Sequence, residues 1–365
     1  MITIIGGGPV GCYTGYLLAK AGFKVEIFEE HGIIGKPFQC TGIVTNSFKN
    51  IIKLRKEFLV NILDKVKVFA PNNDFVELKL KKEEFVIDRV KFDQYLANKS
   101  INAGTSVHLN HKFVGKEKDK IIIKDLKNKK FKKINYKILI GADGPLSQVA
   151  KTFSLYGKRK FFVGHQVRVK FKTYPDCYET YFGKNFPNFF GWVVPESDKV
   201  ARIGLAAKTN SVLFFNKFLN MKNIKEKDII DRQSGIIPIY NSTIKTQKDN
   251  VFLVGDAATQ VKATTGGGLI CGLTTAQCLA ESIIKNEDYE KYWRKKVEKD
   301  LRLHLMIRNI LNRFTDKDYN YLIKLTKKER VKKIIERYDR DFPMKILFKL
   351  LVHEPRFLLF LGKLF

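Results

Sequence analysis

Short apolar runs, each followed by a glycine or an acidic residue, alternate with segments of helical periodicity at the start of this chain. Residues 2–5 form a β-branched run typical of a buried parallel strand. Residues 12–21 have helical spacing and stop before Gly22, a suitable residue for a helix C-terminus. Residues 24–28 form a second predicted strand, so the pattern predicts a β-α-β unit.

Later runs extend this predicted sheet. Residues 137–144 end in Gly-Ala-Asp-Gly, and residues 250–258 contain Gly-Asp ahead of a helical pattern from Gly268 to Ile284. A turn at residues 71–74 and the runs from Phe162 to Ile239 predict a separate antiparallel sheet. We therefore expect a nucleotide-binding domain made of residues 1–65, 88–160 and 245–288. An inserted antiparallel β-sheet (66–87 and 161–244) and a C-terminal helical region (289–365) complete the α/β fold.

The turn after the first strand reads Gly-Gly-Gly-Pro-Val-Gly from residue 6 to residue 11. In such a motif the first glycine permits a tight turn, the second lets the backbone approach a pyrophosphate, and the third lets helix and strand pack closely. The helix N-terminus offers N–H groups and a partial positive charge to phosphates. An acid after the second strand binds ribose hydroxyls. The dinucleotide-binding residues predicted here are Gly6, Gly8, Val10, Gly11 and Glu29.

The glycine motif does not distinguish FAD from NAD, because both dinucleotides use it. The run that ends in Gly255-Asp256 places a further carboxylate at the carboxyl edge of the sheet, beside the ligand crevice. An NAD dehydrogenase has no need of this carboxylate, whereas the ribityl chain of a flavin offers several hydroxyls for it to bind. Asp256 therefore indicates FAD.

With these motifs in this order, the chain resembles the FAD-dependent monooxygenase superfamily that has the p-hydroxybenzoate hydroxylase fold. The matching motifs are G-x-G-x-x-G, Asp-Gly at 143–144 and Gly-Asp at 255–256. The resemblance implies a Rossmann-type FAD-binding domain with Asp256 at the ribityl chain and Asp143 near the pyrophosphate. It also implies that Arg89 lies near the FAD and that the Phe113 backbone meets the adenosine. A surface ion pair is the alternative for Arg89.

Three further stretches narrow the resemblance to the geranylgeranyl reductase family, in particular its archaeal digeranylgeranylglycerophospholipid reductases. Residues 35–42 match a G-x-P-x-x-C-x-G motif, and residues 266–269 match the family's loop beside the flavin ring. Residues 190–195 and 203–206 are similar to the Y-x-W-x-F-P…G-x-G signature that lines the isoprenoid cavity. The residues implied at the flavin are Cys40, Thr41, Gly42, Gly267, Gly268 and Leu269, and those implied at the substrate are Phe190, Trp192 and Pro195.

The chain departs from this signature at several positions. Phe190 replaces a tyrosine, so no mechanism can rest on a hydroxyl there, and Val194, Ala206 and Ala263 replace Phe, Gly and Pro. Cys40 has two readings, a small apolar filler or a group with chemistry at the flavin ring, as proton donor or redox modulator. Backbone contacts from residues 40–42 to FAD are expected under either reading.

Charge adds a possible class of partner. Lys and Arg number 67 against 37 Asp and Glu, a net charge of +30. Either the surface is merely rich in lysine, or it attracts an anionic partner such as a membrane or a phosphorylated substrate. The basic residues follow no nucleic-acid-binding module, so we expect no specific nucleic-acid partner. The five scattered cysteines predict free thiols, no metal site and a cytoplasmic protein, and we expect no secretory signal.

The C-terminal region is basic and amphipathic. Residues 342–353 space Lys345, Lys349 and His353 four apart, and a second apolar stretch follows Glu354-Pro355 up to Phe365. These apolar stretches are shorter than the ~20 residues needed to span a bilayer. Such helices suit the membrane interface, or they pack on the protein's own body or on a second copy.

The resemblance implies an FAD-dependent reductase that saturates C=C bonds of geranylgeranyl chains in archaeal ether-lipid precursors, such as 2,3-di-O-geranylgeranylglyceryl phosphate. We expect it to be cytoplasmic and peripheral on the inner face of the cell membrane, with NAD(P)H and ferredoxin both open as reductants. One alternative in the same fold is an FAD-dependent monooxygenase of aromatic compounds or quinone precursors. Another is a basic flavoprotein that binds nucleic acid. The oligomeric state stays open.

Overall fold

The computed structural model describes residues 1–338, 341 and 343–364, without the side chains of Pro343, Lys345 and Leu364. Phe342 and Phe365, which belong to the expected amphipathic tail, lie outside the described residues. The chain forms two compact units, each from three segments. Unit 1 comprises Met1–Phe38, Arg89–Lys160 and Pro238–Leu301, and unit 2 comprises Gln39–Asp88, Phe161–Ile237 and Arg302–Phe365.

These units differ from the expected domains at several boundaries. Residues 238–244, expected in the antiparallel sheet, and residues 289–301, expected in the helical region, belong to unit 1. Two larger differences concern unit 2. Residues 39–65 belong to unit 2, because β4 (Leu59–Phe69) runs through the expected boundary and pairs along its length with β5 (Phe75–Ile87). Most of the helical region, residues 302–365, also belongs to unit 2, because α8 (Asp316–Thr326) and α9 (Glu329–Arg337) pack on β5.

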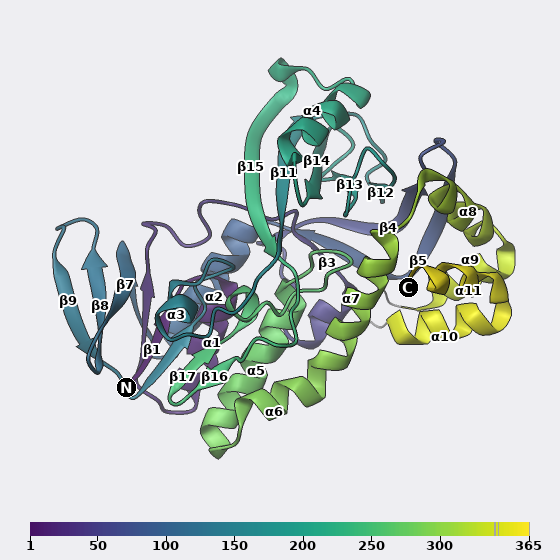
Figure 1. Cartoon of the computed structure of the whole chain (residues 1–365). Helices are drawn as coiled ribbons and strands as arrows, with labels where there is room; N and C mark the ends of the chain where they lie inside the picture. The colour runs from purple at the N-terminus through teal and green to yellow at the C-terminus, as the bar shows by residue number, and fades with distance from the viewer. Residues whose placement is uncertain (339–340, 342, 365) are drawn as a thin grey trace. The chain divides into compact units, whose positions relative to one another are not determined.

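A six-stranded sheet in the order β16-β17-β10-β1-β2-β6 frames unit 1 (Figure 1). All neighbouring strands are parallel except β16 and β17. Because β1, β10 and β17 are neighbours, the loops that follow their carboxyl ends lie together at one edge of the sheet. The strands are β1 (Ile2–Ile5), β2 (Val25–Glu29), β6 (Ser106–Leu109), β10 (Ile138–Gly141), β16 (Gln247–Lys248) and β17 (Val251–Leu253).

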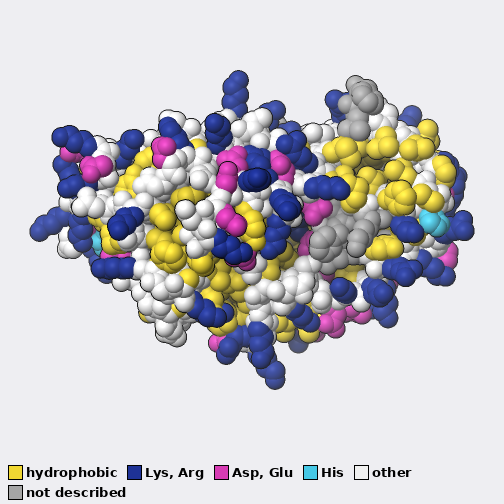
Figure 2. Space-filling model, turned by 90° about the horizontal axis from the view of Figure 1, so that it is seen from below, with side chains coloured by type: hydrophobic (Ala, Val, Ile, Leu, Met, Phe, Trp, Pro, Cys, Tyr) yellow, Lys and Arg dark blue, Asp and Glu magenta, His cyan; other side chains and the backbone are white. Residues whose placement is uncertain are grey.

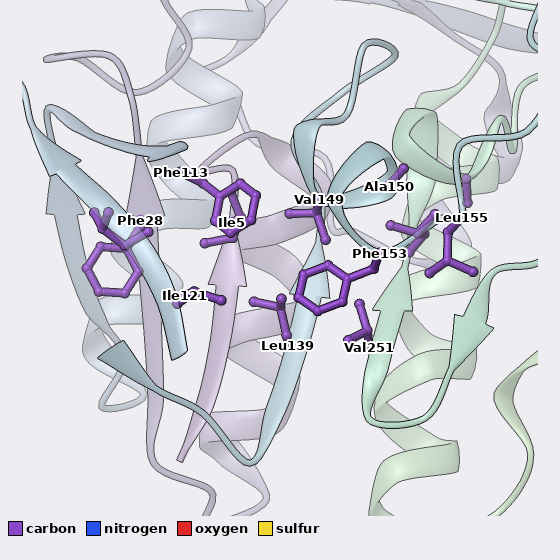
Figure 3. Close-up of a cluster of buried hydrophobic side chains, with 13 residues drawn as sticks. Ile5, Phe28, Phe113, Ile121, Leu139, Val149, Ala150, Phe153, Leu155 and Val251 are labelled. Atoms are coloured by element: carbon purple, nitrogen blue, oxygen red, sulfur yellow. The ribbon is translucent and has the colours of Figure 1, made fainter. Parts of the chain in front are cut away.

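Helices and a small second sheet cover the two faces of this frame. The helices α1 (Pro9–Lys20), α2 (Arg89–Asn102) and α5 (Leu269–Lys285) lie on one face, where α1 contacts both of the others. An antiparallel sheet of β7 (His111–Glu117), β8 (Lys120–Asp125) and β9 (Phe131–Asn135) lies on the other face with α3 (Gln148–Thr152). Its buried side chains, including Phe113 and Ile121, join Ile5, Leu139 and Val149 in one apolar cluster (Figure 3). α6 (Tyr289–Trp293) follows α5.

Unit 2 contains an eight-stranded sheet in the order β15-β11-β14-β13-β12-β4-β5-β3. The pairs β11–β14, β13–β14, β12–β13, β4–β5 and β3–β5 are antiparallel, whereas β12 and β4 are parallel, so the expected antiparallel sheet is mixed at this point. Helix α4 (Ser211–Met221) covers one face over an apolar cluster that includes Val193, Ile203 and Phe218. The remaining strands are β3 (Ile43–Val44), β11 (Phe161–Lys170), β12 (Cys177–Tyr181), β13 (Gly191–Pro195), β14 (Val200–Ala207) and β15 (Ile229–Pro238).

The C-terminal helices are α7 (Lys299–Leu311), which begins in unit 1, then α8, α9, α10 (Pro343–His353) and α11 (Leu358–Leu361). Lys327 of the α8–α9 turn pairs with Asp74, and the Lys79 backbone N–H donates to Glu336, so this region is anchored to the β4–β5 hairpin. Among the described residues, no helix has the length and apolar character needed to cross a membrane. The expected α/β fold, with its Rossmann-type domain and helical C-terminal region, is confirmed.

Candidate active site

Of the four glycines in the turn of unit 1, the fold requires Gly6 and Gly11 but not Gly8. A Cβ on Gly6, whose φ is +104°, would lie 2.3 Å from the Ala142 carbonyl oxygen. A Cβ on Gly11 would lie 2.0 Å from the Gly6 carbonyl oxygen. A Cβ on Gly8 would meet no atom within 4 Å. Gly6 and Gly11 are therefore explained by close packing, whereas the space beside Gly8 is left for a ligand.

The surroundings of this turn suit an anionic dinucleotide. The N-terminus of α1 has no side-chain cap and no acidic residue in its first turn, which favours a bound phosphate. Glu29 accepts hydrogen bonds from the Gly7 N–H (2.6 Å) and from the N–H of His31 (2.9 Å), so its carboxylate is fixed against the turn. Val10 packs against glycines of the later segments, since a Cβ on Gly272 would lie 2.6 Å from its side chain.

We expect Gly8→Ala to lower the affinity for FAD about tenfold or more without changing the stability of the apoprotein. Its φ of −68° and ψ of 178° suit any L-residue, and the added methyl group meets no protein atom. The methyl group would clash only with a ligand close to the backbone. Titration of apoprotein with FAD and thermal unfolding of both proteins measure the two effects. Gly362→Ala, which also adds a methyl group in open space, is the control, and equal FAD affinity in both variants would remove the pyrophosphate from this position.

Asp256 lies in the short helix Gly255–Ala258 that follows β17. Burial raises the pKa of its carboxyl to about 6, and the positive charge of Arg89 opposes this shift. No hydrogen bond to its carboxylate is present among the residues that the structure describes. A desolvated acceptor without a donor suits the hydroxyls of a ligand.

Arg89 is held by Asp93 in the first turn of α2. Its Nε and Nη2 donate to the two carboxylate oxygens at 3.0 and 3.1 Å. The side chains of Arg89 and Asp93 are only 16% and 6% exposed, so the pair is not the surface ion pair considered as the alternative. The positive charge of Arg89 lowers the pKa of Asp256, so the two side chains interact electrostatically.

The glycine loop before α5 comes close to Asp256. A Cβ on Gly268, the N-cap residue of α5, would lie 2.8 Å from Oδ1 of Asp256. The N-terminus of α5, which begins at Leu269, has no side-chain cap. Gly267 forms an isolated bridge with Lys262, which keeps the loop in a compact turn. Unit 1 thus brings together Val10, Arg89, Asp256 and residues 267–269.

Two other expected residues have local partners. Asp143 accepts hydrogen bonds from Ser147 Oγ (2.6 Å) and from the Val149 N–H (3.0 Å), so it holds the start of α3, and burial raises the pKa of its carboxyl. The Phe113 side chain is 4% exposed in the core beneath the sheet, and its backbone lies opposite Ile123. Its expected contact with adenosine stays a prediction.

Arg159, which was not found by sequence analysis, connects the loop after β10 with the short helix after β17. Its guanidinium donates to the carbonyl oxygens of Tyr156 (2.7 Å), Pro145 (3.3 Å) and Ala257 (2.8 Å). Burial lowers its pKa. No motif marks this arginine, because its partners are backbone atoms from distant segments.

Replacement of Arg159 by methionine is expected to lower the free energy of unfolding by about 2–4 kcal/mol, since carbonyl acceptors lose a charged donor. Urea unfolding of the holoprotein measures this loss. Lys158→Met, at the neighbouring position, is the control. Unchanged stability in Arg159→Met would show that these hydrogen bonds do not hold the loops.

In unit 2, the loop of residues 40–42 is fixed by strand residues. Gly42 has a φ of +78°, and a Cβ there would lie 2.4 Å from the Ile87 carbonyl oxygen. Arg202 donates to the carbonyl oxygens of Thr41 and Ile87 and forms a buried ion pair with Glu196 (2.7 Å). The Cys40 thiol is partly exposed and accepts a hydrogen bond from the Gly42 N–H at 3.3 Å.

Gln166 of β11 joins this loop to the aromatic part of the sheet. Its Oε1 accepts hydrogen bonds from the Thr41 hydroxyl (2.8 Å) and from the Trp192 indole N–H (2.8 Å). Its Nε2 donates to Gln233 (2.8 Å). Gln166 is 5% exposed, so all of these partners are needed. No sequence signal marked Gln166, because β11 also carries His165, Arg168 and Lys170 among its apolar residues.

An aromatic wall surrounds Trp192. Phe190 stacks on Phe189 at 4.5 Å and lies 5.8 Å from Trp192. Gly204 gives room for the indole, because a Cβ there would lie 2.6 Å from the Trp192 ring. Phe182, Tyr319 and the buried Arg308 extend the wall, so the C-terminal helices contribute to it. Pro195 lies about 10 Å further along β13 and is not part of this cluster.

Among the described residues, no group of three His, Cys, Asp or Glu side chains could hold a metal ion.

Sequence comparison matches residues 4–47 to the model of an NAD(P)-binding Rossmann-like domain. The chain is 27% identical to a digeranylgeranylglycerophospholipid reductase of Methanocaldococcus jannaschii, which covers 88% of this chain and 89% of that protein. It is 30% identical to an uncharacterized protein of the same organism, over 96% of this chain and 94% of that one.

A crystal structure of a geranylgeranyl bacteriochlorophyll reductase-like protein from Thermoplasma acidophilum has the same fold. Its TM-score is 0.84 at 21% identity, and the match covers 100% of this chain and 98% of the other. Fold and site together define a flavoprotein with a Rossmann-type domain. The chain belongs to the geranylgeranyl reductase family, as its motifs predicted.

Proposed function

We propose that this protein is an FAD-dependent reductase that saturates C=C bonds of geranylgeranyl chains in archaeal membrane ether-lipid precursors. The observation that carries the proposal is the Thr41–Gln166–Trp192 network. This network connects residues 40–42, which resemble the family's flavin loop, to the aromatic side chains around Trp192, which resemble its isoprenoid-binding wall. The names of the relatives support the same reaction.

Each unit, taken by itself, contains residues that the family resemblance implies at the FAD. In unit 1, the α1 N-terminus and the space beside Gly8 suit the pyrophosphate, and Asp256 suits the ribityl hydroxyls. In unit 2, residues 40–42 offer a backbone loop held by Gln166 and Arg202. The complete proposed set is Gly6, Gly8, Val10, Gly11, Glu29, Cys40, Thr41, Gly42, Arg89, Phe113, Asp256, Gly267, Gly268 and Leu269.

When bound, reduced FAD would supply a hydride, which carries both electrons of the reduction, and a proton would complete the saturation of the C=C bond. An isolated alkene is not polarised by a carbonyl, so the chain itself has to orient the substrate and exclude water. Phe190 and Trp192 provide apolar surface for an isoprenoid, and burial of each CH₂ group contributes about 0.8 kcal/mol. Cys40 carries a thiol proton in the loop and is our candidate for a chemical role; a Cys40→Ser variant with full turnover would exclude it.

We place the enzyme in the cytoplasm, with its lipid substrate drawn from the inner face of the cell membrane. NAD(P)H and ferredoxin are both compatible reductants, because the fold's hydroxylases also lack a second dinucleotide motif. The monooxygenase alternative shares the fold but explains neither the motif at residues 35–42 nor the apolar tail.

One experiment tests the proposal. Chemically reduced, purified protein is incubated with digeranylgeranylglyceryl phosphate, and mass spectrometry follows the substrate. We expect mass gains in steps of two hydrogens and much slower gain with Trp192→Ala. No mass gain with bound FAD intact would reject the reductase. Oxygen consumption with a hydroxylated product would support the monooxygenase, and salt-sensitive DNA binding without alkene reduction would support the nucleic-acid-binding flavoprotein.

A further inference from the structure

The helices α10 and α11 leave an apolar surface exposed. Met344, Phe348 and Val352 of α10 are spaced four apart and are 41%, 64% and 59% exposed. Leu358 and Leu359 of α11 are 52% and 64% exposed. We call these five residues the C-terminal apolar face. Figure 2 shows hydrophobic side chains gathered over the C-terminal helices, with Lys and Arg side chains beside them.

This surface is not needed for the internal packing of unit 2. The other side of α10 already contributes Leu350 and Ile346 to an apolar cluster with Phe357 and Phe360. A helix that is apolar on two sides has more hydrophobic surface than its own core uses. Contiguous exposed apolar side chains of this kind mark a membrane or protein contact.

The charges in this part of the chain distinguish a membrane from a protein as the partner. The sequence of residues 343–364 has four basic residues, Lys345, Lys349, Arg356 and Lys363, and one acid, Glu354. Lys363 pairs with Asp318 (3.0 Å) and Arg356 pairs with Glu354, whereas Lys349 is exposed and has no ion pair among the described residues. Glu354 is 7% exposed and is paired with Lys328 (2.8 Å) and Arg356 (2.8 Å), so its charge is neutralised inside the protein. A symmetric contact with a second copy would bring the same basic residues together. A partner with an apolar interior and a negatively charged surface would suit both the exposed apolar side chains and the basic residues.

We propose that the C-terminal apolar face docks on the surface of an anionic lipid bilayer. The apolar side chains enter the boundary between head groups and acyl chains, and exposed basic side chains such as Lys349 meet lipid phosphates. The inference goes beyond the proposed reaction and does not depend on it, because docking requires no turnover.

The test is co-flotation of the FAD-loaded protein with vesicles of phosphatidylcholine, with or without phosphatidylglycerol. We expect binding to the anionic vesicles that weakens as salt is added. Phe348→Asp combined with Leu359→Asp should lower the partition coefficient about tenfold or more. The matched control is Phe131→Asp in unit 1, because Phe131 is also 64% exposed. This control should bind as the unaltered protein does.

Three results would overturn the proposal: no flotation of the unaltered protein, equal loss in the Phe131 control, or a dimer that the double variant converts to monomer. Thermal stability and flavin absorbance show whether the double variant is folded. Reduction of detergent-dispersed substrate separates the two proposals, since a double variant that no longer docks should still turn over. A protein that docks but reduces no alkene would reject only the reaction.

Discussion

Asp256→Asn is expected to weaken FAD binding about a hundredfold and, at neutral pH, to stabilise the apoprotein. The carboxylate is desolvated, which raises its pKa to about 6 from an ordinary value of 3.8. As an acceptor for two ribityl hydroxyls, the charged group contributes about 1.5–3 kcal/mol per hydrogen bond, and an amide contributes less. Without FAD, the same charge is unfavourable, and asparagine removes it.

The sign of the pH dependence follows from the direction of this shift. A carboxyl with a raised pKa in the folded state contributes stability at low pH, which is lost as the pH rises from about 4 through about 6. The affinity for FAD should change in the opposite direction, because only the ionised form accepts both hydrogen bonds.

Urea unfolding of the apoprotein and FAD titration between pH 4 and pH 8 measure both effects. In the Asp256→Asn variant, the pH profiles of stability and of FAD affinity should both lack the change caused by this carboxyl. Asp119→Asn, an exposed position in the turn between β7 and β8, is the control. Should Asp256→Asn bind FAD as tightly as the unaltered protein, Asp256 would not be the ribityl ligand.

The positions of the unit 1 loops in the fold could be predicted from the sequence, because these loops follow directly on periodic elements. Gly6 to Gly11 come after an apolar strand, and Asp256 comes after another, so the position of each in the fold follows from the element before it. Parallel strands bring these loops to one edge whatever the intervening sequence is. The helix before Gly22 and the helix after Gly268 were predicted for the same reason.

The polar contacts of unit 2 could not be predicted in this way. Thr41 and Gln166 are 125 positions apart, and their contact depends on how β3, β5 and β11 are arranged in one sheet. Arg202 likewise binds backbone carbonyls, which carry no residue identity for a motif to display. The boundary at residue 65 was wrongly placed inside β4 for a related reason, because a long amphipathic strand has no break in its pattern there.

Gln166→Leu is expected to reduce turnover about tenfold to a hundredfold and to lower the free energy of unfolding by about 2–4 kcal/mol. Leucine is similar in size but accepts no hydrogen bond, so the Thr41 hydroxyl and the Trp192 indole N–H lose their shared acceptor in a buried position. Each such loss costs about 1–3 kcal/mol. Small displacements of groups that position a substrate have large effects on rate.

A double-mutant cycle separates this positioning role from a general loss of stability. Thr41→Val and Trp192→Phe each remove one donor to Gln166, so their effects on kcat should be non-additive in the unaltered protein. In the Gln166→Leu background, the same two changes should be additive, because the residue that couples them is absent. Gln94→Leu, which breaks a single 3.4 Å hydrogen bond to Ile34 in unit 1, controls for loss of a partly buried amide. Additive effects in both backgrounds would mean that Gln166 supports the fold of the sheet but does not align the loop with the aromatic wall.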